Sequence, residues 1–163
     1  MPNCKSYRVF KLKCTLVMQD PDMSGPRFHT VIFVETNGQG PGSGVKHHVT
    51  GDLVQGMQYE AEPYGNPESF ENFATMELIG YTKANIYPEK WDSHLKAIPP
   101  PPKQKAFNIG TMRTEPVKSW DPLVFYEPGE ARVPLIKCTE WAEQQAIPSL
   151  ISNGLIETRK LSS

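Results

Sequence analysis

The sequence has few cysteines, almost no excess charge and no long hydrophobic run. Its cysteines, Cys4, Cys14 and Cys138, are an odd number without paired metal-ligand spacing, which argues against a disulfide framework and a structural zinc site. Lys and Arg total 17 against 18 Asp and Glu, so no strong field exists to attract nucleic acid or anionic lipid. We therefore expect reduced thiols and no nucleic-acid partner.

Nowhere do about 18 apolar residues occur consecutively, which predicts no transmembrane segment. Residues 1–8 lack the apolar run of a signal peptide, so we expect a cytoplasmic protein. No internal repeat is apparent, and 163 residues are the usual size of one domain. We expect a single domain over 1–163, of unknown oligomeric state.

The first part of the chain has the pattern of an antiparallel sheet. Apolar and polar residues alternate after Ser6, and later β-branched and aromatic runs are separated by turn-forming or glycine-rich segments. We predict a strand meander over 1–64, with strands at 8–18, 28–35, 45–50 and 57–62. Weaker signals predict a short helix near 66–73, a strand at 77–82 and a helix at 89–97.

The last third divides into an irregular part and a helical part. Much of the proline lies between Pro88 and Pro134, and 98–137 shows little periodicity, so we expect a Pro-rich irregular segment there. Helix-forming residues then predict a helical segment at 138–154, which Pro148 should kink or divide. The predicted class is α+β: an antiparallel sheet of about four to six strands packed against a C-terminal helix that carries Cys138.

Cys138 is the residue around which a catalytic site can be predicted. At a helix start, unpaired backbone N–H groups and the helix dipole favour an anion, and therefore a nucleophilic thiolate. The same N–H groups can hold the oxyanion that forms when a thiolate attacks a carbonyl. A thiol also needs a basic partner, which the chain can supply only from His29, His47, His48 and His94.

His29 lies in an otherwise apolar predicted strand, on the same face as Val31 and Phe33. An uncharged imidazole there needs a specific partner to offset its desolvation. For His29 alone, a core histidine bonded to a backbone carbonyl is the simpler interpretation, as a small buried apolar residue is for Cys138 alone. Their pairing gains weight from the surrounding sequence.

The order of these features resembles a known group. It comprises the run 27–34 with His29, a glycine-rich hairpin, a second histidine strand at 46–51 and a late Lys137-Cys138-Thr139-Glu140-Trp141. This order looks like the circularly permuted papain-like group, whose best-known branch is the lecithin:retinol acyltransferase-like family. Small uncharacterised fungal proteins share similar HVTGD, GMxYE and late Cys-x-x-Trp patterns. In this group the histidine precedes the cysteine, which opens a helix packed on the sheet.

The resemblance implies that Cys138 is the nucleophile and His29 the base that polarises it. A residue of the next strand would orient His29, and strand alternation lets only one of His47 and His48 reach it. Motif register favours His48, with His47 as the alternative. We expect Trp141 to form a pocket wall.

The implied function is that of a cysteine-dependent hydrolase or acyltransferase. It would act through an acyl-cysteine on an ester, thioester or amide, without a cofactor, and its partner would be a small-molecule or acyl substrate. Two alternatives stay open. One is a non-catalytic binding module on the same fold, and the other is a small biosynthetic isomerase or cyclase that uses His29 as a general base.

A metal site is a weaker interpretation of the same region. His47 or His48 could ligate a metal together with Glu60 or Glu62 of the neighbouring strand. Because adjacent histidines point to opposite faces and the carboxylates can be solvated, we predict no metal site.

Overall fold

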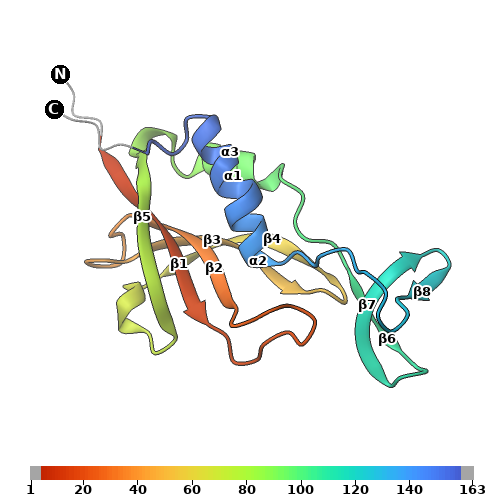
Figure 1. The fold of residues 1–163 in the computed structure, drawn as a ribbon. Coiled ribbons are helices and arrows are strands. Elements are labelled where there is room, and N and C mark those ends of the chain that lie inside the picture. Colours follow the sequence, from red (N-terminus) through yellow and green to blue (C-terminus); the bar gives the residue numbers. More distant parts are fainter. Residues whose placement is uncertain (1–4, 159–163) are drawn as a thin grey trace.

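The computed structural model describes residues 5–158, which form a large antiparallel sheet with helices on one face and a smaller sheet beside it (Figure 1). The large sheet has the strand order β4-β3-β2-β1-β5, and every neighbouring pair is antiparallel. Its strands are β1 (Ser6–Thr15), β2 (Phe28–Glu35), β3 (Gly44–Asp52), β4 (Gly56–Tyr64) and β5 (Phe73–Lys83). The first four strands are a meander, and β5 returns to pair with β1 on its free side.

The two faces of the large sheet bury separate apolar clusters, because successive side chains of a strand point to opposite faces. One cluster joins Val9, Ile32 and Val49 to the helices. The other contains Leu12, Val31 and Phe33 and lies on the face away from the helices. Short 3-10 turns η1 (Pro67–Ser69) and η2 (Ala84–Ile86) flank β5.

The helices α1 (Glu89–Lys96) and the C-terminal helix cover the first face. The C-terminal helix runs from Cys138 to Ser152 as α2 (Cys138–Glu140), a wider π-helical segment η3 (Trp141–Ala146) and α3 (Ile147–Ser152). Pro148 was expected to kink or divide this helix; the helical run has no gap there, and Pro148 lies in the first turn of α3. Because proline lacks an N–H and its ring crowds the carbonyl four residues earlier, the wider π segment lets the chain pass Pro148 without a break.

A smaller sheet corrects the prediction that 98–137 is irregular. Its strands are β6 (Lys105–Asn108), β7 (Arg113–Trp120) and β8 (Leu123–Phe125), in the order β6-β7-β8. The sheet lies to the side of the helices in Figure 1. Most of its residues are at least partly exposed, so burial imposes no alternating apolar pattern. Pairing therefore occurs without the sequence signal by which a strand is recognised.

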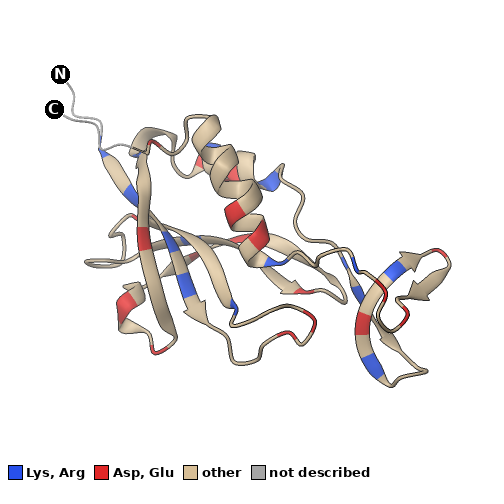
Figure 2. Ribbon diagram, in the orientation of Figure 1, with Lys and Arg blue, Asp and Glu red and all other residues tan. Residues whose placement is uncertain are grey.

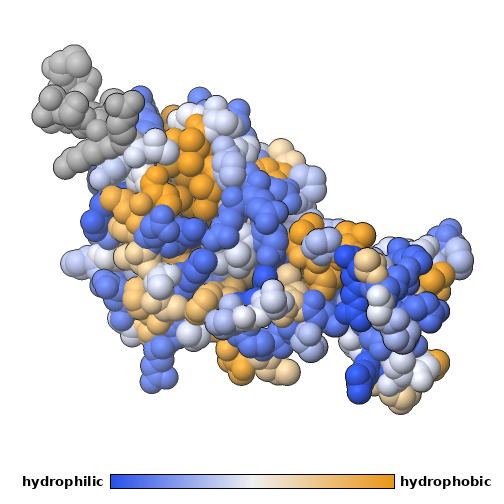
Figure 3. Space-filling model, in the orientation of Figure 1, coloured by the Kyte–Doolittle hydropathy of each residue, from blue (hydrophilic) through white to orange (hydrophobic). Residues whose placement is uncertain are grey.

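The mixed α+β class, dominated by antiparallel strands with Cys138 on a C-terminal helix, is confirmed. Figure 2 shows acidic and basic residues interspersed over both sheets and the helices, as the balanced composition suggests. On the face shown in Figure 3, hydrophobic surface lies between β5 and the C-terminal helix. Within residues 5–158, no helix combines the length and apolar character needed to cross a membrane.

Candidate functional site

The candidate site lies where β2 and β3 separate. Their ladder has three pairs, from Val34 opposite Val45 to Ile32 opposite His47, although both strands continue beyond it. A cavity of about 200 Å³ is lined by residues from the unpaired ends of both strands and from the start of the C-terminal helix. These are Leu16, Arg27, Phe28, His29, Val49, Thr50, Gly51, Met57, Lys137 and Cys138.

Cys138 is the first residue of the C-terminal helix and is 5% exposed. Among the described residues, its thiol makes one hydrogen bond, with Sγ 3.8 Å from the backbone oxygen of Phe28. The next side chain, Thr139, lies 3.3 Å from the same oxygen and 2.8 Å from the hydroxyl of Thr30. The helix start therefore contacts the β2 residue that immediately precedes His29.

An ion pair fixes this end of the helix. The Arg27 guanidinium donates two hydrogen bonds to Glu140, of 3.0 and 2.8 Å, and the same carboxylate accepts from the backbone N–H of Lys137 at 2.8 Å. Glu140 thus caps the helix and ties it to the residue before β2. Burial disfavours its charge, but the hydrogen bonds from Arg27 and Lys137 outweigh burial and lower the pKa of Glu140.

His29 and His48 are brought together, with 2.8 Å between Nε2 of His29 and Nδ1 of His48. No described hydrogen bond links either ring to Cys138, so the structure joins the two predicted histidines to each other and places the thiol across the same cavity from His29. Burial, then the charges of Lys46 and Lys137, lowers the pKa of His29. Burial, then His29 and Lys46, lowers that of His48 to about 4. Both rings are therefore neutral at pH 7.

His47, the alternative third residue, points to the helix-covered face and is fully buried. Its Nδ1 lies 2.6 Å from the hydroxyl of Tyr59, and its Nε2 lies 2.7 Å from that of Tyr87. Because Tyr59 donates its one proton to Asp92 at 3.0 Å, it must accept from His47, so the proton of the neutral ring is on Nδ1. Burial, then the charge of His48, lowers the pKa of His47 to about 3.

Trp141 was predicted to form a pocket wall. Its side chain is fully buried in the helix-side core, 6.0 Å from the ring of Tyr59 between centroids, and it does not line the cavity that contains Cys138. Cys138 and Trp141 are three residues apart and belong to the same buried cluster, but only the thiol, at the end of the helix, also lines the cavity.

Sequence reasoning missed Arg27, Thr30 and Glu140 as residues that position the site. The glutamate three residues after Lys137 is the spacing of a capping box and could have been recognised. Nothing local marks Arg27 as its partner, because 113 residues separate the two.

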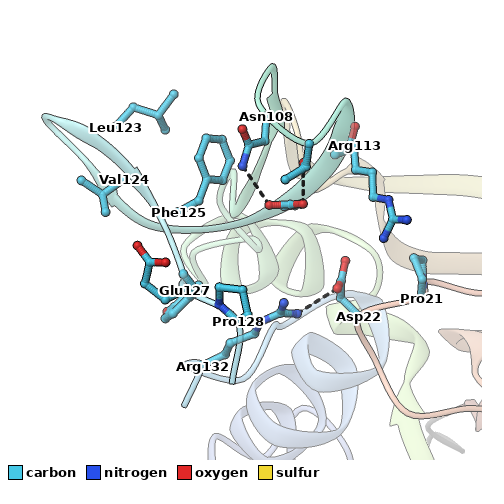
Figure 4. Close-up of a pocket in the computed structure, with 14 residues that line it drawn as sticks. Pro21, Asp22, Asn108, Arg113, Leu123, Val124, Phe125, Glu127, Pro128 and Arg132 are labelled. Carbon is cyan, nitrogen blue, oxygen red and sulfur yellow. Dashed lines mark hydrogen bonds and ion pairs between the residues drawn. The ribbon is translucent and has the colours of Figure 1, made fainter. Parts of the chain in front are cut away.

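A second cavity, of about 960 Å³, is a groove beside the smaller sheet (Figure 4). Leu123, Val124 and Phe125 line it together with charged residues. Two of the charged groups, Arg132 and Asp22, form an ion pair at 2.9 Å, and the carboxylate of Glu115 accepts a hydrogen bond of 3.0 Å from the Asn108 amide. Its 14 lining residues include no cysteine or histidine, so this groove does not offer the chemistry of the smaller cavity.

Comparison with known proteins identifies a family, but the function of that family is unknown. No curated protein and no solved structure matches the chain. A family model described as a family of unknown function, DUF6540, matches residues 16–157. That span includes His29, His48 and Cys138, the groups that line or adjoin the cavity between β2 and β3. By the extent of this match, the chain belongs to the DUF6540 family.

Proposed function

We propose that the protein is a cysteine-dependent hydrolase or acyltransferase in which Cys138 attacks a substrate carbonyl with His29 as its base. The observation that carries this proposal is the contact between His29 and His48. Since Nε2 of His29 is engaged at 2.8 Å, its Nδ1 is the nitrogen left to receive a proton in the cavity that the thiol also lines. This arrangement is consistent with the permuted papain-like group that the sequence resembles.

The proton positions follow from the role of His29. To act as a base, His29 must carry its proton on Nε2, which donates to Nδ1 of His48 and leaves a lone pair on Nδ1. His48 then carries its own proton on Nε2, which lies 3.7 Å from a carboxylate oxygen of Glu62. A carboxylate at that distance favours the protonated nitrogen, so His48 orients His29 in its basic tautomer.

The reaction would proceed in two steps. Cys138 turns from the Phe28 carbonyl toward His29, the thiol proton passes to Nδ1, and sulfur bonds to the substrate carbonyl carbon. Backbone N–H groups of the first helical turn stabilise the oxyanion. The leaving group departs with the proton from His29, and water or an amine, deprotonated by His29, then releases the acyl group. His29 can accept the proton because it is neutral at pH 7.

Thiol reactivity tests the first step. We expect iodoacetamide to modify Cys138 faster than Cys14 in the native protein at pH 7. Cys14 is the comparison thiol, because it is also 5% exposed and lies opposite His29 in the β1–β2 ladder, but its place is in an apolar cluster where burial raises its pKa. His29→Gln should slow modification of Cys138 by about tenfold or more. Equal rates of modification at the two thiols in the native protein would show that Cys138 is not an activated nucleophile, which contradicts the proposal.

Acyl transfer is tested with p-nitrophenyl esters of increasing chain length. Mass spectrometry should find an acyl adduct on the Cys138 peptide, and Cys138→Ser should abolish the thioester adduct while the protein still folds. Absence of an adduct with every ester, despite a reactive thiol, would favour the alternative of a non-catalytic binding module.

A further inference from the structure

We propose that His48, Glu60 and Glu62 form a divalent-cation site on the face of the large sheet away from the helices. Their donor atoms lie within 4.8 Å of one another. His48 and Glu60 are directly opposed in the β3–β4 ladder, and Glu62 lies two residues further along β4 on the same face. One imidazole nitrogen and two carboxylates are a donor set that suits Zn²⁺ or Co²⁺.

The orphaned nitrogen of His48 points to a ligand. His48 is 3% exposed, and its Nε2 has no hydrogen-bond partner although it is buried. A buried polar atom without a partner calls for an explanation, and an ion is one. The other ring nitrogen is already held at 2.8 Å by His29, as is usual for a metal-ligating histidine. His48 is therefore oriented with its free nitrogen toward the two glutamates.

The distances are close to those a bound ion requires. A tetrahedral Zn²⁺ with ligands at about 2.1 Å separates its donor atoms by about 3.4 Å. Nε2 of His48 is already 3.7 Å from the carboxylate of Glu62. Glu60 and Glu62 are only partly buried, so side-chain rotation can bring in the third donor. Water would complete the coordination, because the strands supply three ligands.

Lys46 is the group that opposes an ion here. Its ammonium lies 3.5 Å from the carboxylate of Glu62 and 4.5 Å from the centroid of the Tyr64 ring. A cation bound by Glu62 would repel this ammonium, which can leave the carboxylate and remain over the aromatic face. Replacing Lys46 by a neutral residue should therefore strengthen binding, whereas replacing either glutamate should weaken it.

A bound ion would also change the hydrogen bond between the two histidines. Coordination through Nε2 requires the proton of His48 to be on Nδ1, which then donates to Nε2 of His29. His29 would in turn carry its proton on Nδ1, so it could not take one from Cys138. This consequence, unlike the site itself, rests on the proposed function, and it predicts that the ion slows reaction of the thiol.

Calorimetric titration with Zn²⁺ tests the site, in a background with both Cys14→Ala and Cys138→Ala, which removes the thiol opposite His29 and the thiol of the cavity as competing ligands. We expect one ion per chain, at least tenfold weaker binding for Glu60→Gln and Glu62→Gln, and tighter binding for Lys46→Met. Glu77→Gln, a carboxylate on the opposite edge strand β5, is the matched control and should leave affinity unchanged. Equal affinity for all four variants, or no binding to the parent, would overturn the site.

Alkylation of Cys138 in the wild-type protein separates this inference from the proposed function. Saturating Zn²⁺ should slow iodoacetamide, and the effect should be lost in Glu60→Gln. If Zn²⁺ binds with the expected variant pattern but leaves the rate unchanged, the site stands and His48 is removed from the catalytic proposal.

Discussion

Arg27 and Glu140 are joined by two parallel hydrogen bonds, although one lies just before β2 and the other in the first turn of the C-terminal helix. Both side chains are about 15% exposed, so water screens the pair weakly. The pair sets the position of Cys138 relative to the strand that carries His29.

Arg27→Met should therefore destabilise the protein and disturb the site together. The variant leaves a partly buried carboxylate without its partner, which costs about 2–4 kcal/mol in free energy of unfolding. Urea denaturation measures this loss. The matched control is Arg8→Met, because Arg8 makes a similar two-bond contact with Glu35 but is 53% exposed and should cost at most about 1 kcal/mol. Similar losses in both variants would contradict the importance of burial.

The predictable and unpredictable parts of the fold differ in burial. Strand β2 (Phe28–Glu35) was predicted with its observed bounds, because β-branched and aromatic residues fill both of its buried faces. Strand β7 (Arg113–Trp120) was missed, because all of its residues except Pro116 are at least partly exposed and carry no alternating apolar pattern. A strand can be recognised from its own sequence only where burial favours β-branched and aromatic side chains in it.

The sequence predicted which residues belong to the candidate site, but not which of them contact one another. Alternation separates His47 from His48, but the partners of His47, Tyr59 and Tyr87, are 12 and 40 residues away. The contact of His29 with His48 depends on where the β2–β3 ladder ends, which is a property of the folded sheet. No local pattern specifies these distances.

His47 predicts a loss of stability in acid. Its pKa in the folded protein is about 3, against about 6.5 when unfolded, so between these values the unfolded chain binds more protons. The contribution of His47 to the free energy of unfolding should be fully present above pH 6.5 and should decrease as the pH falls toward 3. Near pH 4.5 the loss from this group should be about 2–3 kcal/mol. Urea midpoints measured across this range test the slope, which His47→Phe should reduce even though its Tyr partners lose a hydrogen bond.

The tautomer of His47 provides a second measurement of the same network. Long-range ¹⁵N–¹H correlation spectra should show the proton on Nδ1 and no titration of this ring above pH 5. A proton on Nε2 would contradict the chain of hydrogen bonds from His47 through Tyr59 to Asp92.

Gly44 should be intolerant of any side chain. A Cβ atom there would lie 2.0 Å from the carbonyl oxygen of Val34 and 2.9 Å from the ring of Phe33, so the β2–β3 ladder would have to open. We expect Gly44→Ala to cost more than about 2 kcal/mol, measured by thermal or urea unfolding. The control is Gly38→Ala in the preceding hairpin, where the nearest atom is 3.4 Å away. Equal stability of the two variants would contradict the close approach.

Lys105 should hold the smaller sheet against the β1–β2 loop. Its ammonium is 2.9 Å from Asp20 and 2.7 Å from Asp22, and it is 7% exposed at the start of β6. Burial disfavours the charge of Asp20, but the hydrogen bonds from Lys105 and from the backbone N–H of Asp22, together with the charge of Lys105, outweigh burial and lower the pKa of Asp20. The folded protein therefore releases this proton more readily, so the stabilisation is present above pH 4 and is lost as the pH falls further.

Lys105→Met should loosen the smaller sheet before the rest of the protein. It leaves Asp20 without its cation, whereas Asp22 keeps Arg132 at 2.9 Å, and we expect a local loss of about 2–4 kcal/mol. Hydrogen exchange should then increase in β6 and β7 while β1 and β2 stay protected. Adding Asp20→Asn should restore part of the protection, because the carboxylate that has lost its cation is then neutral. If exchange rises equally in both sheets, or if the neutralised variant recovers nothing, Lys105 acts through packing of its stem and not through its charge.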